Sequence, residues 1–125
     1  MAIDRAQLEG RWNCRKILVN GDGVIAYPYF NCAIRQTSQC LELTKTTGSQ
    51  RIAGCLHTMN ERHFAFVGRW QTDYGTGATA GFVSAANRSR LRMIEPDGSG
   101  ITVYDMWRSG KADAVPSPPP AAGSR

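Results

Sequence analysis

Apolar and polar residues alternate along most of the chain, which is the pattern of β-strands with one buried face. Phe64, Phe66 and Trp70 share one side of their segment, and Leu91 and Met93 alternate with arginines. Because side chains of a strand point alternately to its two faces, this alternation indicates half-buried strands. Eight strands are predicted in this way, over residues 10–19, 24–36, 39–46, 50–58, 63–71, 78–86, 89–95 and 100–108.

Short turn sequences separate these strands, namely NGDG, TTGS, MNER, TDYGTG, ANRS and EPDGSG. Glycine, asparagine and aspartate favour such turns because they tolerate the backbone conformations that a tight reversal needs. Many short strands at close spacing are typical of sandwiches and barrels. Pro28 falls inside the second predicted strand, and since proline cannot donate a ladder hydrogen bond, it marks a bulge or an edge there.

The two ends of the chain differ from the strands. Asp4 and Gln7 have the spacing of a capping box, which predicts a short helix over residues 4–9. After Arg108 the sequence is rich in proline and alanine and offers almost nothing to bury, so a disordered tail is predicted. The predicted organisation is an N-terminal segment (1–9), one β domain (10–108) and a tail (109–125).

Composition and charge are those of a globular domain. The 125 residues are 42% hydrophobic and carry a net charge of +5. The longest uncharged stretch, VIAYPYFNCAI, is far shorter than the about 20 apolar residues of a spanning helix, so no transmembrane segment is expected. The start, MAIDRAQLEG, has no continuous apolar run and is not a signal peptide. Arg88, Arg90 and Arg92 form a basic stripe without aromatic platforms, and no nucleic acid is expected as a partner.

The four cysteines, Cys14, Cys32, Cys40 and Cys55, do not have the spacing of a metal site. Zinc ligands usually come in pairs two to four residues apart, and no such pair exists here. The two histidines, His57 and His63, fall on different predicted strands. We therefore expect neither a metal ion nor a cofactor.

A hairpin over residues 39–58 explains one cysteine pair. A turn centred between Thr47 and Gly48 places Cys40 directly opposite Cys55. The same register puts leucine and isoleucine side chains on one face, as a strand with one buried face requires. Of the two disulfides that the sequence allows in this way, Cys40–Cys55 is our second choice, after a bond between Cys14 and Cys32.

The first hairpin offers the other pair. A three-residue loop centred on Gly23 would place Cys14 opposite Cys32, and this is the disulfide that we expect first. The alternative is four reduced cysteines that act as small apolar residues. A disulfide would indicate an oxidising compartment such as a bacterial periplasm.

Gly10-Arg11-Trp12 in the first strand and Arg108 at the end of the last one resemble the closing arrangement of lipocalin-like (calycin) barrels. In that arrangement an arginine lies across the indole and seals the base of the barrel, as a cation–π contact. The resemblance implies a small eight-stranded antiparallel up-and-down β-barrel, with Trp12 and Arg108 as its structural closure.

Three longer stretches, GRWNCRKI, YPYFNCAI and LTKTTGSQRIAGCL, together resemble an uncharacterised family of proteobacterial envelope proteins. This family is catalogued as domain of unknown function 4893, and the resemblance covers residues 8 to about 108. It implies an exported, periplasmic β-rich domain in which Cys14 is paired with Cys32. It implies no activity.

Candidate binding residues lie in one polar turn and among the aromatic residues. Ser49, Gln50 and Arg51 are predicted to contact a ligand at the rim of the barrel; the alternative is that they only stabilise the turn. Trp70 and Tyr29 are predicted to line a cavity, and core packing is the alternative for both.

The expected function is that of a non-enzymatic binding module of the bacterial envelope. Its partner would be a small apolar or amphipathic ligand, or an envelope protein. One alternative is a periplasmic protease inhibitor, because one such family also uses an eight-stranded barrel. A second is a hydrolase built on His57 or His63, although neither histidine lies near a serine or cysteine motif of known type.

Overall fold

Strands form almost all of the described structure. In this computed structural model, which describes residues 2–45, 47, 50–98 and 100–109, nine antiparallel strands follow a short 3₁₀ helix, η1 (Arg5–Leu8). The strands are β1 (Gly10–Asn20), β2 (Gly23–Ala26), β3 (Phe30–Gln36), β4 (Leu41–Lys45), β5 (Arg51–Thr58), β6 (His63–Thr72), β7 (Gly75–Asn87), β8 (Arg90–Asp97) and β9 (Gly100–Arg108). The predicted all-β chain is confirmed.

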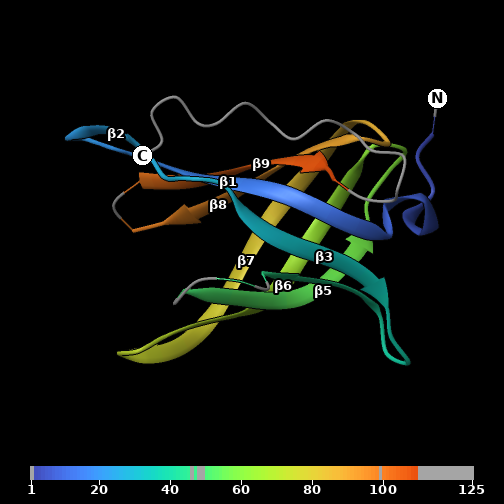
Figure 1. Cartoon of the computed structure of the whole chain (residues 1–125), viewed down its shortest axis with the longest axis horizontal. Coiled ribbons are helices and arrows are strands. Elements are labelled where there is room, and N and C mark those ends of the chain that lie inside the picture. Colours follow the sequence, from blue (N-terminus) through green and yellow to red (C-terminus); the bar gives the residue numbers. More distant parts are fainter. Residues whose placement is uncertain (1, 46, 48–49, 99, 110–125) are drawn as a thin grey trace.

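The sheet closes on itself. Its strand order is β2-β1-β3-β4-β5-β6-β7-β8-β9, and β9 pairs again with β1 from Trp12–Arg108 to Asn20–Gly100. Figure 1 shows the resulting barrel, with β2 as an extension beside β1. Each strand other than β2 pairs with a neighbour on both sides, which gives the eight-stranded up-and-down barrel that was predicted.

The second predicted strand, 24–36, is interrupted at residues 27–29. Residues 17–20 of β1 pair with β2, and residues 10–14 of β1 pair with β3. Pro28 lies in the interruption, where it lacks the N–H group that a ladder would need. The backbone of Tyr27 still holds this segment to β1, because its N–H donates to the carbonyl of Lys16 at 2.9 Å.

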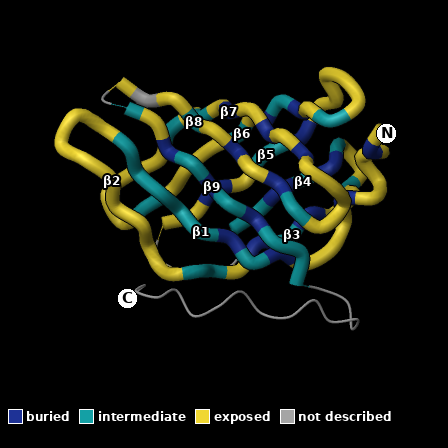
Figure 2. Tube along the Cα trace, turned by 90° about the horizontal axis from the view of Figure 1, so that it is seen from above, coloured by how far each residue is buried: buried dark blue, intermediate teal, exposed yellow. Residues whose placement is uncertain are grey.

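The apolar core fills the end of the barrel that carries η1. Figure 2 shows buried positions alternating with exposed ones along the strands and gathering toward this end. Large side chains with almost no exposure form this core: Leu8, Trp12, Ile34, Leu41, Leu43, Leu56, Phe64, Phe66, Val83, Leu91, Met93 and Met106. The predicted capping box is present, since the Asp4 carboxylate accepts from the N–H of Ala6, and the Asp4 N–H donates to the Gln7 side chain.

Trp12 and Arg108 lie together at the base of the barrel. The Arg108 guanidinium carbon is 4.6 Å from the centroid of the Trp12 ring. The Arg108 side chain also donates to the carbonyls of Gln7, Glu9 and Arg88. A Cβ atom on Gly10 would stand 2.6 Å from an Arg108 nitrogen, and Gly10 has a φ of +140°, so only glycine fits this position.

A disulfide joins Cys40 to Cys55, as predicted. The register of the hairpin differs from the predicted one by two residues, because Cys55 lies opposite Glu42 and Gly54 lies opposite Leu43. A shift of two residues leaves every side chain on its original face, so the predicted apolar face is still the buried one. Cys40 precedes β4 and reaches Cys55 diagonally, with 5.7 Å between the Cα atoms.

The expected disulfide between Cys14 and Cys32 is absent, and its predicted register is wrong. Cys14 lies opposite Phe30, and Cys32 lies opposite Trp12. The physical reason is the position of the turn, because Asn20 pairs with Gly23 and the reversal therefore falls on residues 21 and 22 instead of around Gly23. The interruption at 27–29 moves the pairing by only one residue, so that Cys14 lies opposite Phe30 instead of Tyr29. Both thiols are buried in the core.

The part of the chain that the structure describes contains no helix long and apolar enough to cross a membrane. The predicted tail lies outside the described residues from position 110 onward.

Candidate functional site

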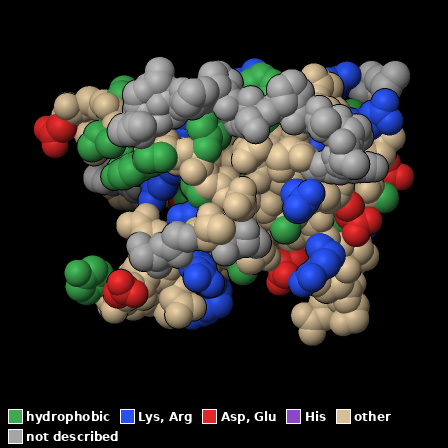
Figure 3. Space-filling model, viewed as in Figure 1, with side chains coloured by type: hydrophobic (Ala, Val, Ile, Leu, Met, Phe, Trp, Pro, Cys, Tyr) green, Lys and Arg blue, Asp and Glu red, His purple; other side chains and the backbone are tan. Residues whose placement is uncertain are grey.

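A cavity of about 800 Å³ opens at the end of the barrel opposite η1. The β1–β2 and β6–β7 hairpins extend beyond this end, as Figure 1 shows. Figure 3 shows the molecule hollowed between these extensions, with basic side chains in the hollow. We call this space the open-end cavity; its walls include Lys16, Leu18, Lys45, Ile52, Trp70 and Tyr104.

The apolar wall of the open-end cavity is formed by side chains on the inner face of the strands. Leu18, Ile52 and Phe66 line it, and Phe66 belongs to the buried core below. The Trp70 indole packs closely on Gly77 of β7, so closely that a Cβ atom at this glycine would lie only 2.6 Å from the indole Nε1 atom. Trp70 lines the cavity and is 38% exposed, so it remains partly open to solvent.

Charged side chains line the same cavity. Lys16 Nζ donates to the Gln50 side-chain oxygen at 2.9 Å, and Arg51 also lines the wall. Lys45 Nζ lies 4.4 Å from the centroid of the Phe30 ring. One acidic residue, Glu95 of β8, lines the cavity as well.

A hydrogen bond from the neighbouring strand, β7, holds the Glu95 carboxylate in place. It accepts a hydrogen bond from the hydroxyl of Thr79 on β7. Thr102 and Tyr104 of β9 add two hydroxyl groups to the lining, and both residues are buried. The cavity therefore combines an apolar wall with a small number of polar groups, as small-molecule sites usually do.

Burial changes the proton affinity of three groups at or below the cavity. It lowers the pKa of the Lys45 ammonium, and the positive charge of Lys16 lowers this pKa further. It raises the pKa of the Tyr104 hydroxyl well above its ordinary value, and Glu95 adds to this rise. It also raises the pKa of the Cys14 thiol, which hydrogen-bonds to Cys32. Tyr104 and Cys14 are thus neutral at neutral pH.

The predicted ligand contacts are only partly brought together. Gln50, Arg51 and Trp70 line the open-end cavity. Ser49 lies outside the described residues. Tyr29 is not part of the cavity lining; it lies in the 27–29 segment, with the Arg15 guanidinium carbon 5.5 Å from its ring centroid.

Sequence reasoning missed Lys16 and Lys45, although the alternation contained their signal. Lys16 follows Trp12 and Cys14 at alternate positions of β1, and Lys45 follows the buried leucines of β4. A lysine that continues an inward-facing series must point into the barrel.

The two histidines lie away from the cavity. His57 is exposed on β5, and His63 is exposed at the start of β6, where its Nδ1 atom lies 2.8 Å from the Asn60 side-chain oxygen. Neither histidine belongs to the cavity lining. Within the described residues, no group of three or more side chains is suited to hold a metal ion.

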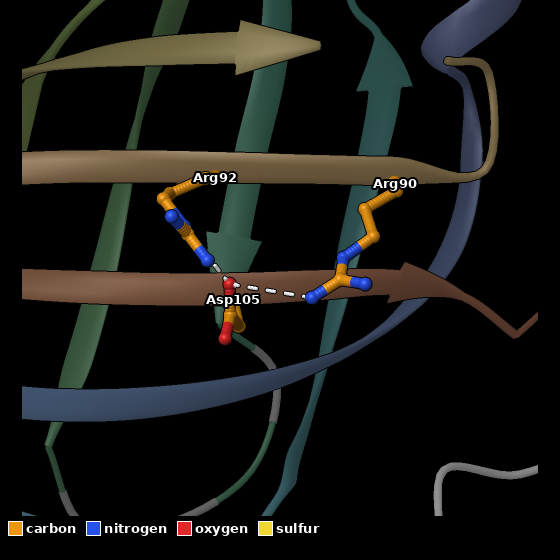
Figure 4. Close-up of polar contacts among 3 residues, drawn as sticks. All are labelled: Arg90, Arg92 and Asp105. Carbon is orange, nitrogen blue, oxygen red and sulfur yellow. Dashed lines mark hydrogen bonds and ion pairs between the residues drawn. The ribbon is translucent and has the colours of Figure 1, made fainter. Parts of the chain in front are cut away.

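The basic stripe belongs to the outer surface. Figure 4 shows Arg90 and Arg92 of β8 on either side of Asp105 of β9, whose carboxylate oxygen is 4.0 Å and 3.1 Å from them. Arg90 also lies over the ring of Trp107, 3.9 Å from its centroid. These contacts support a structural role for Arg90 and Arg92, in which they tie two neighbouring strands together.

Comparison with known proteins supports the fold and identifies a family. A solved structure of a redesigned β-barrel has a TM-score of 0.66 to this chain at 12% sequence identity, and the match covers 88% of this chain and 98% of that one. At so low an identity the likeness concerns the fold alone. A search of curated proteins finds no match. Residues 1–103 match the family described as domain of unknown function DUF4893, and the chain therefore belongs to that family.

Proposed function

We propose that the protein is a non-enzymatic, lipocalin-like binding module that takes up a small amphipathic molecule in the open-end cavity. The observation that carries this proposal is the cavity itself, at about 800 Å³ and open to solvent at one end. Small-molecule sites usually measure about 300–1,000 Å³ and combine apolar walls with a few polar groups. The other end of the barrel is closed by Trp12 and Arg108, so a ligand would enter and leave at the open end.

We further propose that the protein works in the bacterial envelope or another oxidising space. The Cys40–Cys55 disulfide supports this proposal, because such bonds persist mainly outside the reducing cytosol. The resemblance to envelope proteins points the same way.

The protease-inhibitor alternative receives less support. It would need a free N-terminal segment to enter a protease cleft. Ile3 and Leu8 are instead buried against the barrel, and the N–H of Ile3 donates to the carbonyl of Glu61 at 2.8 Å.

The proposal can be tested with the neutral fluorescent probe N-phenyl-1-naphthylamine, whose emission increases in apolar surroundings. We expect saturable binding of one probe molecule per wild-type chain. Trp70→Ala should weaken binding because it removes part of the cavity wall. Trp107→Ala is the matched control, since Trp107 lies on the outer face beside Arg90. Non-saturable binding, or equal effects of the two variants, would contradict ligand uptake in the cavity.

A further inference from the structure

Two lysines face the interior of the barrel, which is an unusual place for this residue. Lys16 pairs across the ladder with Tyr104, and Lys45 pairs with Cys32. Tyr104 and Cys32 are both buried, and directly paired residues of neighbouring strands share a face. Both lysines also line the open-end cavity.

The charges of the open-end cavity are unbalanced. Lys16, Lys45 and Arg51 bring three positive charges to its lining, and Glu95 brings one negative charge. Lys45 has a ring contact with Phe30, but no carboxylate of the described residues lies within ion-pair distance of it.

We propose that the ligand is an amphipathic acid whose anionic head group binds between Lys16 and Lys45 inside the cavity. This inference rests on the proposed function, and it adds the chemical class of the ligand. Two ammonium groups can hold the oxygens of a carboxylate by charge-assisted hydrogen bonds, which are stronger than neutral ones. Ile52 and Trp70 would pack against the apolar part of the same molecule.

The electrostatics of the open-end cavity favour an anionic ligand. Burial and the charge of Lys16 lower the pKa of Lys45, with a smaller contribution from Arg51 in the same direction. Cys32 and Cys14 act in the opposite sense. A nearby negative charge would favour the protonated form of Lys45, so binding an acid would relieve the repulsion between the two ammonium groups.

Glu95 determines which part of the cavity receives the head group. Its carboxylate is held by Thr79, and both belong to the β7–β8 side of the barrel. A bound acid would be repelled from that side and attracted to the side formed by β1 and β4. The same arrangement disfavours a cationic ligand at the lysines.

The test compares decanoate with decanol, which has the same chain length but no charge. Affinities would be measured by calorimetry at pH 7.5 on wild type, Lys45→Met, Lys16→Met and Arg11→Gln. Arg11 is exposed on the outer face of β1, so Arg11→Gln removes one positive charge outside the cavity. Circular dichroism and a thermal melt would show that each variant is folded, and Lys45→Gln would replace Lys45→Met if the latter is not.

We expect wild type to bind decanoate more tightly than decanol. Each lysine variant should lose about tenfold in decanoate affinity and retain its decanol affinity, whereas Arg11→Gln should change neither. Equal binding of the two compounds, or equal losses in Arg11→Gln and Lys45→Met, would overturn the inference but leave ligand binding intact. If wild type binds neither compound, the proposed function is overturned as well.

Discussion

The guanidinium of Arg108 lies across the indole of Trp12, so the last strand closes the same end of the barrel as the first. The Trp12 Nε1–H donates to the carbonyl of Leu8 at 3.0 Å, which fixes η1 under the ring. Arg108 in turn donates to the carbonyls of Gln7 in η1 and of Glu9, its C-cap residue. One planar cation and one indole thus hold the N-terminal segment, η1 with the start of β1, to the end of β9, which is distant in the sequence.

Arg108→Lys should therefore destabilise the protein although it keeps the charge. Lysine has no planar fork of donors, so it can replace neither the set of bonds to Gln7, Glu9 and Arg88 nor the stacking on Trp12. We expect the free energy of unfolding to fall by about 2 kcal/mol, measured by urea denaturation. Arg11→Lys is the control, because Arg11 is exposed on the outer face. An unchanged midpoint in Arg108→Lys would mean that the closure contributes little to stability.

The Cys40–Cys55 disulfide should contribute measurably to stability. It closes a loop with a sequence separation of 15 residues, for which the chain-entropy account gives about 3 kcal/mol. We expect the urea midpoint of wild type to fall when dithiothreitol is added, and that of the double variant Cys40→Ser/Cys55→Ser to be low with or without the reductant. A thiol assay on denatured wild type should detect two free thiols, those of Cys14 and Cys32. Detection of none would show that these two are also bonded.

Most of the fold was predicted from the alternation of apolar and polar residues, because the two-residue period of a strand determines which side chains are buried. This alternation identified the strands and the buried face of the β4–β5 hairpin even though the register was two residues off. The predicted Cys14–Cys32 pairing was wrong because register depends on the turn, which lies at residues 21 and 22 instead of around Gly23.

Closure of the sheet shows another limit of the sequence. No local pattern says that β9 will pair with β1, and the cavity exists only because they do pair. Lys16 and Lys45 come from strands that are neighbours of β3 on opposite sides. The alternation within each strand is enough to predict that its lysine points inward. That the two lysines line one cavity depends on closure of the sheet, which no single strand shows.

The contact between Trp70 and Gly77 gives a prediction about the cavity wall. A Cβ atom at position 77 would stand 2.6 Å from the Trp70 Nε1 atom, so Gly77→Ala should displace the indole. We expect a shift in tryptophan emission and weaker binding of N-phenyl-1-naphthylamine. Gly98→Ala is the matched control, because a Cβ atom there would meet nothing within 4 Å. Identical emission spectra for the two variants would contradict the packing of Trp70 on β7.

The buried thiol and hydroxyl predict a loss of stability at alkaline pH. The folded-state pKa values of Cys14 and Tyr104 are raised above the ordinary values of 9.0 and 10.0, mainly by burial. The unfolded chain therefore releases these protons first, so both groups contribute stability that is complete below pH 9 and is lost as the pH rises. Urea midpoints measured between pH 8 and about 10.5 should fall in wild type, and the fall should be smaller in Tyr104→Phe, which has no phenolic proton to lose. Tyr74→Phe is the matched control, because Tyr74 is 99% exposed and its hydroxyl is equally hydrated in both states. If Tyr104→Phe and Tyr74→Phe show the same pH dependence as wild type, the Tyr104 hydroxyl is not held neutral by the fold.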